Sequence, residues 1–348
     1  MQLPAQKFFL FGIADRRKLL YRGGRLTDLR SGEVVWSANV AEGSESIDAT
    51  RTQVTVETDR GVVVLREDAA GVWVGGERVA SGRPVNLPTF AEHKHGPRLR
   101  ALHHEILVNM VDGRPLPNLL AYDRPWYRDA AMVGMVLEKT NNLELIRDWV
   151  RGLREPFDRN NIPPGGTAEQ AETEADNLGQ VLYLLSLADN ASHPLVPKVL
   201  EAARRFERSG ALFGRTDFAD HPVYITKWMK FGLASLGLED PYVIPRVPDS
   251  YSALVWWAYR SEHVPTARLS KETGERYPYL AWAEAHFYRT RVPPLPRAEA
   301  FPQTWQAEAS AANYARMAAV SSEYEMRKIA APHAWHAAEV FLYLMDVG

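Results

Sequence analysis

The chain has 348 residues, a formal net charge of -2 and 46% hydrophobic residues, so it can bury one large core or two unequal ones. This charge balance gives no basic footprint for nucleic acid, and no segment has the roughly 18 uninterrupted apolar residues of a membrane span. The absence of cysteine excludes disulfides, thiolate nucleophiles and cysteine-ligated metals. The N-terminal apolar run is too short for a secretion signal, so we expect a cytoplasmic protein with no nucleic-acid or membrane partner.

Residues 1–92 predict a small antiparallel β-sheet domain. Short β-branched or aromatic runs are separated by turn signals such as Gly23-Gly24 and Asp59-Arg60-Gly61. Polar and apolar residues alternate in one of these runs, as they do in a sheet with one solvated face. The predicted strands are Lys7–Gly12, Lys18–Tyr21, Glu33–Ser37, Thr52–Thr58, Val62–Arg66 and Val72–Val74. No cluster of residues in this part has a catalytic composition.

Residues 93–348 have a helical pattern throughout, which makes the predicted fold mostly α. Alternate helices open with aromatic and polar residues and then become small and apolar. The helices between them, such as Leu195–Arg208, are amphipathic with a charged outer face. Buried helices that alternate with half-exposed ones predict an inner and an outer ring, which is a helical barrel or toroid. The openings of the inner helices lie at Trp126, Glu174, Tyr224, Asp249, Thr304 and His333.

The stretch Asn118–Glu138 is the most informative part of this pattern. Pro125 suits the first turn of a helix, and the residues from Ala130 to Leu137 are small or apolar on all sides. Charged residues and rings crowd the entrance, where Arg128 and Asp129 follow two aromatic residues. This entrance either faces a ligand or holds a structural Arg–Asp pair covered by rings. Both interpretations remain open at this point.

In a ring of helices the inner N-termini gather at one mouth, where acidic side chains and the partial positive helix ends favour each other. Aromatic rings among acids suit a carbohydrate, because sugar C–H faces lie on rings and hydroxyls bond to Arg and Asp. Glycoside cleavage needs one protonated carboxyl group and one ionised carboxylate. The predicted mouth has more acids than the reaction uses, namely Asp129, Glu172, Glu174, Asp176, Asp249, Glu308, Glu323 and Glu325.

The segment Arg124–Met132 resembles the start of the second barrel helix in glucoamylases and related six-hairpin glycosidases. Glu174–Gln180 is similar to the opening of the family's fourth helix, and Ser322–Tyr324 with Pro332–Glu339 resembles its base motif and last helix. The resemblance implies an (α/α)6 barrel after the β domain. It also implies that Trp126 stacks on a sugar while Arg128 and Asp129 hold its hydroxyls. The predicted substrate-binding residues further include Tyr127, Asn177, Asp249 and Trp335.

The loop that matches the family's acid-bearing loop reads Thr216–Pro222 and has Asp217 and Asp220 but no glutamate. Glu174–Asn177 also resembles the helix start of unsaturated glucuronyl hydrolases, in which an aspartate initiates hydration of a double bond. Asp176 is the acid that both resemblances place in the site, and we predict it as the general acid beside Asp129. The alternative is that Asp176 only caps its helix. The other catalytic candidates are Glu174 and, as the base, Glu323 or Glu308.

These observations predict an inverting glycoside hydrolase that acts on an oligosaccharide or glycoside. The alternatives are a glucuronyl-type hydratase, a non-catalytic carbohydrate-binding protein on the same barrel, and a scaffold with a covered mouth. The pairs His103-His104 and His333 with His336 are not spaced as a metal site, so we predict no metal and no cofactor. The sequence does not give the sugar, the linkage or the oligomeric state.

Overall fold

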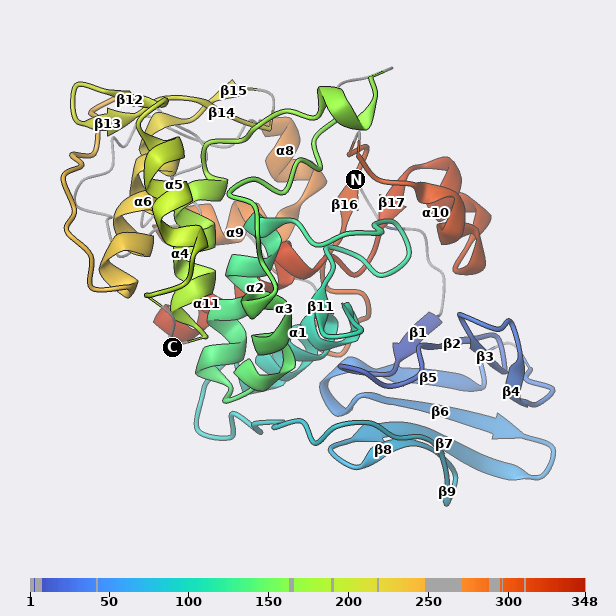
Figure 1. Ribbon diagram of the computed structural model, residues 1–348. Coiled ribbons are helices and arrows are strands. Elements are labelled where there is room, and N and C mark those ends of the chain that lie inside the picture. Colours follow the sequence, from blue (N-terminus) through green and yellow to red (C-terminus); the bar gives the residue numbers. More distant parts are fainter. Residues whose placement is uncertain are drawn as a thin grey trace. The chain divides into compact units, whose positions relative to one another are not determined.

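The computed structural model describes residues 3, 8–41, 43–162, 166–188, 191–217, 219–247, 271–287, 295, 297–309 and 311–347 (Figure 1). The chain forms two compact units. Unit 1 comprises Arg124–Glu138 and Ile146–Leu295, and unit 2 comprises Gln2–Asp123, Lys139–Leu145 and Pro296–Gly348. Each unit is therefore assembled from segments that are distant in the sequence.

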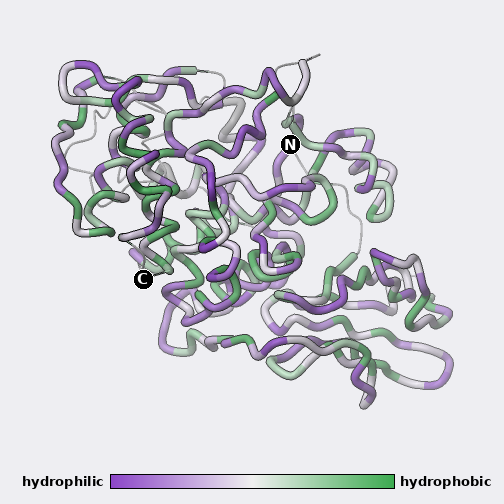
Figure 2. The backbone as a smooth tube through the Cα atoms, in the orientation of Figure 1, coloured by the Kyte–Doolittle hydropathy of each residue, from purple (hydrophilic) through white to green (hydrophobic). Residues whose placement is uncertain are grey.

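Unit 2 begins with two antiparallel sheets in which neighbouring strands follow one another along the chain. Their strands alternate between hydrophilic and hydrophobic stretches (Figure 2), and the apolar side chains of both sheets meet in one core that includes Phe9, Tyr21, Val54 and Leu65. The first sheet contains β1 (Phe8–Phe11), β2 (Leu19–Arg22), β3 (Arg25–Asp28) and β4 (Val34–Ser37). The second contains β5 (Glu45–Asp48), β6 (Gln53–Thr58), β7 (Gly61–Asp68), β8 (Gly71–Val74) and β9 (Glu77–Ala80).

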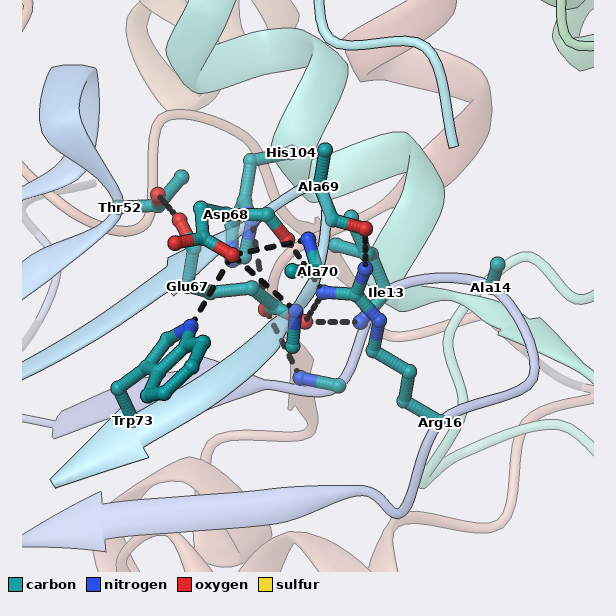
Figure 3. A network of polar contacts seen from close by, with 12 residues as sticks. Ile13, Ala14, Arg16, Thr52, Glu67, Asp68, Ala69, Ala70, Trp73 and His104 are labelled. Atoms are coloured by element: carbon teal, nitrogen blue, oxygen red, sulfur yellow. Dashed lines mark hydrogen bonds and ion pairs between the residues drawn. The ribbon is translucent and has the colours of Figure 1, made fainter. Parts of the chain in front are cut away.

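A buried polar network joins the loop after β1 to the end of β7 (Figure 3). The carboxylate of Glu67 accepts hydrogen bonds from the backbone N–H groups of Gly12 and Ile13 and from Nη1 of Arg16, each at 2.9 Å. Arg16 also donates to the carbonyl oxygens of Asp68 and Ala69 at 2.7 Å. The ion pair and these hydrogen bonds compensate the two charges, which allows both side chains to be buried.

The remaining elements of unit 2 lie after residue 95. Helix α1 (Gly96–Val108) packs against α11 (Ala334–Val347), and Ser321 caps the short helix α10 (Ser322–Met326) by accepting from the N–H of Glu323. Two small two-stranded sheets pair β10 (Met110–Val111) with β11 (Arg114–Pro115) and β16 (Gln306–Ala307) with β17 (Ile329–Ala330). Short 3-10 helices are Ala49–Arg51, Leu143–Leu145 and Tyr314–Ala319.

Unit 1 is built around the contact between α4 (Asn177–Ser186) and α6 (Pro222–Ser235). Gly179 and Gly232 allow this close approach, since a Cβ atom on Gly179 would lie 2.2 Å from the backbone of Trp228. The other helices are α2 (Tyr127–Lys139), α3 (Arg147–Arg151), α5 (Leu195–Ala203), α8 (Lys271–Arg276) and α9 (Pro278–Phe287), with a 3-10 turn at Ala168–Gln170. Two hairpins pair β12 (Glu207–Arg208) with β13 (Ala211–Leu212) and β14 (Arg215–Thr216) with β15 (Ala219–Asp220).

The prediction of a mostly α fold with an (α/α)6 barrel is wrong. A five-stranded antiparallel sheet, a four-stranded one and several small sheets accompany the helices, and the described residues show no clear helical toroid. Where the sequence pattern predicts an inner helix that opens at Thr304, the chain instead forms a strand and a 3-10 turn, because Gln306–Ala307 pairs with Ile329–Ala330. A helical apolar period marks a buried face, but it does not fix where that face packs. Among the described helices, none combines the length and apolar character needed to cross a membrane.

Candidate functional site

The guanidinium group of Arg128 lies at the centre of a buried group of acids in unit 1. Its Nε donates to Oδ2 of Asp176 at 2.9 Å, Nη1 donates to Oδ1 of Asp217 at 2.6 Å, and Nη2 donates to Oε1 of Glu174 at 2.9 Å. Nη2 also donates to the hydroxyl of Thr216 at 2.8 Å. We call Arg128 and these three carboxylates the acid cluster. Its hydrogen bonds make Arg128 the fixed centre of the arrangement.

Three chain segments bring these residues together. Arg128 lies in the first turn of α2, Glu174 and Asp176 precede α4, and Asp217 follows β14 in a hairpin. The last two segments are joined by a hydrogen bond from the N–H of Ala175 to the carbonyl oxygen of Arg215 at 2.9 Å. The N–H of Asp217 in turn donates to Oε1 of Glu174. The geometry of the cluster therefore depends on backbone contacts as well as on the charges.

Burial changes the protonation of the acids in this part of unit 1. Glu174 is 1% exposed, and burial raises its pKa to about 7 although Arg128 opposes the rise. The nearby carboxylates of Asp176, Asp217 and Asp158 raise it further. Burial also raises the pKa of Asp129 to about 8 and that of Asp158 to about 6. One arginine faces several acids here, so some of these carboxyl groups hold a proton near neutral pH.

Asp217 differs from the other members because its side chain is 26% exposed, whereas those of Arg128, Glu174 and Asp176 are at most 3% exposed. Its backbone has a φ angle of +51°, a left-handed conformation that is uncommon for residues other than glycine. The amide of Asn161 fixes this turn by donating to the carbonyl oxygen of Asp217 at 3.1 Å. Asp217 is thus the member of the acid cluster that solvent reaches.

Asp176 precedes α4 but does not cap it with its side chain. Its Oδ2 atom instead accepts from Arg128 and from Nε2 of Gln180, the latter at 2.8 Å. Among the described residues, the second oxygens of Asp176 and Glu174 and Oδ1 of Asp129 have no hydrogen-bond partner. A helix cap therefore does not explain why Asp176 lies at this position.

The other predicted site residues of unit 1 lie around the cluster. Trp126 is half-buried just before α2, and the buried Tyr127 donates its hydroxyl to the carbonyl oxygen of Glu155 at 3.0 Å. Asn177 is buried, accepts from the N–H of Asp158 and donates to Gln180. Asp158 also accepts from the N–H of Tyr127 at 2.7 Å, which satisfies the first N–H of α2.

The remaining predicted residues have different surroundings. Glu323 belongs to unit 2, where it accepts from Arg327 at 2.9 Å in an (i, i+4) ion pair that is partly exposed. Glu308 is exposed in unit 2 with a φ angle of +61°, and the half-buried Trp335 lies against His336. Asp249 lies outside the described residues. The roles predicted for these residues stay predictions.

The sequence interpretation assigned no role to Asp217, Thr216 or Asp158. The loop with Asp217 and Asp220 was identified by its position in the chain, but the pattern did not show which aspartate turns toward Arg128. Asp220 lies exposed in β15. The best sequence signal for Asp217 is the run Arg215-Thr216-Asp217 before a short turn. Such runs are too common in proteins to identify a site.

Among the described residues, no group of three or more acids and histidines is arranged to hold a metal ion. No protein-family model matches this chain, and no curated protein and no solved structure matches it either.

Proposed function

We propose that unit 1 carries the acid–base site of a carbohydrate-active hydrolase, with Glu174 as the proton donor and Asp217 as the base that activates water. The observation that carries this proposal is the unequal environment of the two carboxyl groups. Both bind Arg128, but Glu174 is buried with a pKa of about 7, whereas Asp217 is partly exposed. Glycoside hydrolysis uses one protonated carboxyl group and one ionised carboxylate, and unequal environments separate the pKa values of two such groups.

A proton donor works best when its pKa lies near the working pH, because it is then protonated often enough and still releases its proton. The free Oε2 of Glu174 is the oxygen that would carry this proton, since Oε1 accepts from Arg128 and Asp217. Asp129, the residue after Arg128 in the sequence, has a pKa of about 8 and is a second group that holds a proton near neutral pH. In this proposal Arg128 and Asp176 position the acids and do not touch the substrate.

A carbohydrate substrate is supported by the ring that precedes these groups. Trp126 is half-buried next to the first turn of α2. Sugar C–H faces stack on such rings, and partly exposed carboxylates such as Asp217 accept hydrogen bonds from hydroxyl groups. The substrate predicted from the sequence, an oligosaccharide or glycoside, therefore remains part of the proposal.

The second candidate is a protein without catalytic activity in which the acid cluster is structural. This alternative is favoured by the four hydrogen bonds that Arg128 donates within unit 1, because a buried ion group needs such compensation to be tolerated. A non-catalytic protein would bind a sugar without releasing reducing ends from it.

The two functions are separated by a screen of neutral and acidic oligosaccharides for release of reducing ends. If one is cleaved, Glu174→Gln and Asp217→Asn should each lower turnover by roughly a hundredfold or more, as the loss of general acid or base catalysis does. Glu201→Gln is the matched control, since Glu201 pairs with Arg204 on the exposed face of α5. Full turnover in Glu174→Gln would contradict the assignment.

A further inference from the structure

The β-sheet part of unit 2 contains a second place where a ligand fits. An open cavity of about 720 Å³ lies between the edge of the four-stranded sheet and the turn that joins β6 to β7. Its lining contains Arg25 and Trp36 from the first sheet and Arg60 from that turn. The small polar residues around them are Ser37, Asn39, Thr58 and Asp59.

The charged groups of this cavity are available for a ligand. Arg25 and Arg60 are exposed, and within the described residues neither guanidinium group forms an ion pair or a side-chain hydrogen bond. Two arginines and Asp59 give the lining a net charge of +1. An unpaired guanidinium group binds carboxylate, sulfate or phosphate through two parallel N–H donors. The cavity therefore favours an anionic ligand.

The walls of the cavity are fixed by the fold. Trp36 packs against the core of the two sheets while it lines the cavity, so its indole is held in place. The turn that carries Arg60 is closed by two contacts, in which the N–H of Arg60 donates to the hydroxyl of Thr58 and that hydroxyl donates to Gly61. A fixed ring and a fixed turn reduce the entropy that is lost when a ligand binds.

We propose that this cavity binds an acidic saccharide, with a sugar ring against Trp36 and its carboxylate or sulfate group on Arg25 and Arg60. The polar side chains of Asn39, Thr58 and Asp59 match the hydroxyl groups of such a sugar. The charge preference follows from the cavity alone, and the choice of a saccharide rests on the function proposed for unit 1. The cavity would then hold an acidic polymer on the protein at a site separate from the acid cluster.

The probe for this proposal is tetragalacturonic acid, and its fully methyl-esterified form is the matched neutral control. Titration calorimetry on the full chain should detect binding of the acid form, with affinity that falls as salt is added. The ester should bind about tenfold more weakly or not at all, because a charge-assisted hydrogen bond is lost. Equal binding of acid and ester, or no binding of either, overturns the proposal.

Variants locate the bound ligand. Arg25→Gln and Arg60→Gln should each weaken binding of tetragalacturonic acid by about tenfold, and both are exposed changes that the fold tolerates. Arg30→Gln, an exposed arginine in the turn before β4 and outside the cavity, should leave binding unchanged. If Arg25→Gln and Arg60→Gln bind as the wild type does, the cavity is not the site. Adenosine monophosphate is titrated in the same way. If it binds and tetragalacturonic acid does not, the ligand is not a saccharide and the proposal is overturned.

The same titration separates this proposal from the function of unit 1. In Asp217→Asn the part of the binding that depends on Arg25 and Arg60 should persist, because Asp217 does not line the cavity. Binding that disappears in Asp217→Asn belongs to the acid cluster and overturns the cavity assignment. If no saccharide is cleaved but Arg25 and Arg60 still control binding, the hydrolase proposal fails and the cavity proposal stands.

Discussion

Arg128 is surrounded by acids from two other segments, so its positive charge has a structural role whatever the chemistry of the site. Its side chain is 3% exposed and donates to Asp176, Asp217 and Glu174. Buried carboxylates without a cation are strongly unfavourable. The network therefore couples the folding of unit 1 to the presence of one guanidinium group.

Arg128→Met should destabilise the protein by roughly 3–5 kcal/mol, which is typical for removal of one partner of a buried ion pair. The comparison is Arg204→Met, because the exposed Arg204–Glu201 pair at the end of α5 should contribute about 1 kcal/mol or less. Urea unfolding followed by circular dichroism measures both. Equal free energies of unfolding for the wild type and Arg128→Met would show that the acids do not need this charge.

At the residue scale the sequence predicted part of the cluster. The sequence pattern marks the start of α2 and the acidic residues before α4 as parts of one site, and the fold brings Arg128 together with Glu174 and Asp176. The role given to Arg128, holding sugar hydroxyls, is untested, and four of its hydrogen bonds go to the protein. Asp217 was not selected because its position depends on a hairpin with a left-handed residue. Such a backbone conformation has no reliable signature at an aspartate.

At the scale of elements, α4, the helix that follows Glu174 and Asp176 in the chain, packs closely against α6. The two helices touch through Gly179 and Gly232, and a Cβ atom on Gly232 would lie 2.5 Å from the carbonyl oxygen of Gly179. The atoms nearest to a methyl group added at Gly179 are backbone atoms, which cannot move aside as a flexible side chain can. Helices packed this closely resist even small changes in volume.

Gly179→Ala should therefore destabilise unit 1 by about 1–3 kcal/mol, the usual cost of overpacking. Gly274→Ala is the control because Gly274 also lies in a helix of unit 1 and a Cβ atom there would meet its nearest atom at 3.4 Å. That change should be neutral or stabilise by up to about 1 kcal/mol through helix propensity. Thermal unfolding measures the Tm of both variants. Equal shifts in Tm for Gly179→Ala and Gly274→Ala would show that the α4–α6 contact does not require glycine at position 179.

Helix α11 in unit 2 holds a second pH-sensitive group outside the acid cluster. Glu339 is 1% exposed, and burial alone raises its pKa from 4.5 to about 8. A raised pKa in the folded state contributes stability that is complete below about pH 4.5 and is lost as the pH rises through about 8. As the pH rises, the folded protein must either keep the proton on Glu339 or bury a negatively charged carboxylate.

Glu339→Gln should remove this contribution to the pH dependence. Between pH 5 and 8 the wild type should lose stability more steeply than the variant, by roughly 1–3 kcal/mol over that range. Some slope should persist because burial also raises the pKa values of Glu105 and Asp129 to about 8 and that of Glu174 to about 7. Glu57→Gln, an exposed change on β6, should keep the wild-type slope. Identical slopes in the wild type and Glu339→Gln would show that Glu339 does not hold its proton.

The sequence identified the start of α2 and six of the nine strands of the two sheets, because local periodicity and turn residues mark such elements. It did not predict β3, β5 or β9. It failed at residues 306–330, where β16 pairs with β17. That pairing joins segments more than twenty residues apart and competes with a helical pattern of alanines. Long-range pairing of this kind overrides local propensity and leaves no periodic signal.

At the scale of the whole molecule, one compact unit combines the N-terminal sheets with segments from the other end of the chain. Phe8 and Phe9 in β1 pack against Phe301, and the N–H of Ala49 donates to the carbonyl oxygen of Glu299 at 3.0 Å. The β sheets, α1 and the C-terminal segment therefore share one unit. No sequence pattern indicates that Phe8 and Phe301, almost 300 positions apart, pack in the same core.

A fragment of residues 1–92 should not fold cooperatively on its own, because it lacks the side chains that cover β1. The ring of His104 stacks on that of Phe9 with centroids 5.0 Å apart, and the ring centroid of Phe301 lies 4.5 Å from that of Phe9. We expect broad amide resonances and no sigmoidal urea transition for the fragment. A cooperative transition with native-like dispersion would show that residues 1–92 are an independent domain.

The proposed role of Glu174 as proton donor requires that the acid cluster keep its carboxyl group protonated near neutral pH. Carbon-detected NMR of the Glu carboxyl groups, assigned with Glu174→Gln, measures this directly in the folded protein. We predict that Glu174 titrates near pH 7 and that Asp176→Asn lowers its pKa, since one neighbouring negative charge is removed. A Glu174 resonance that titrates near pH 4.5, unchanged in Asp176→Asn, would show that Glu174 is ionised at neutral pH and cannot be the donor.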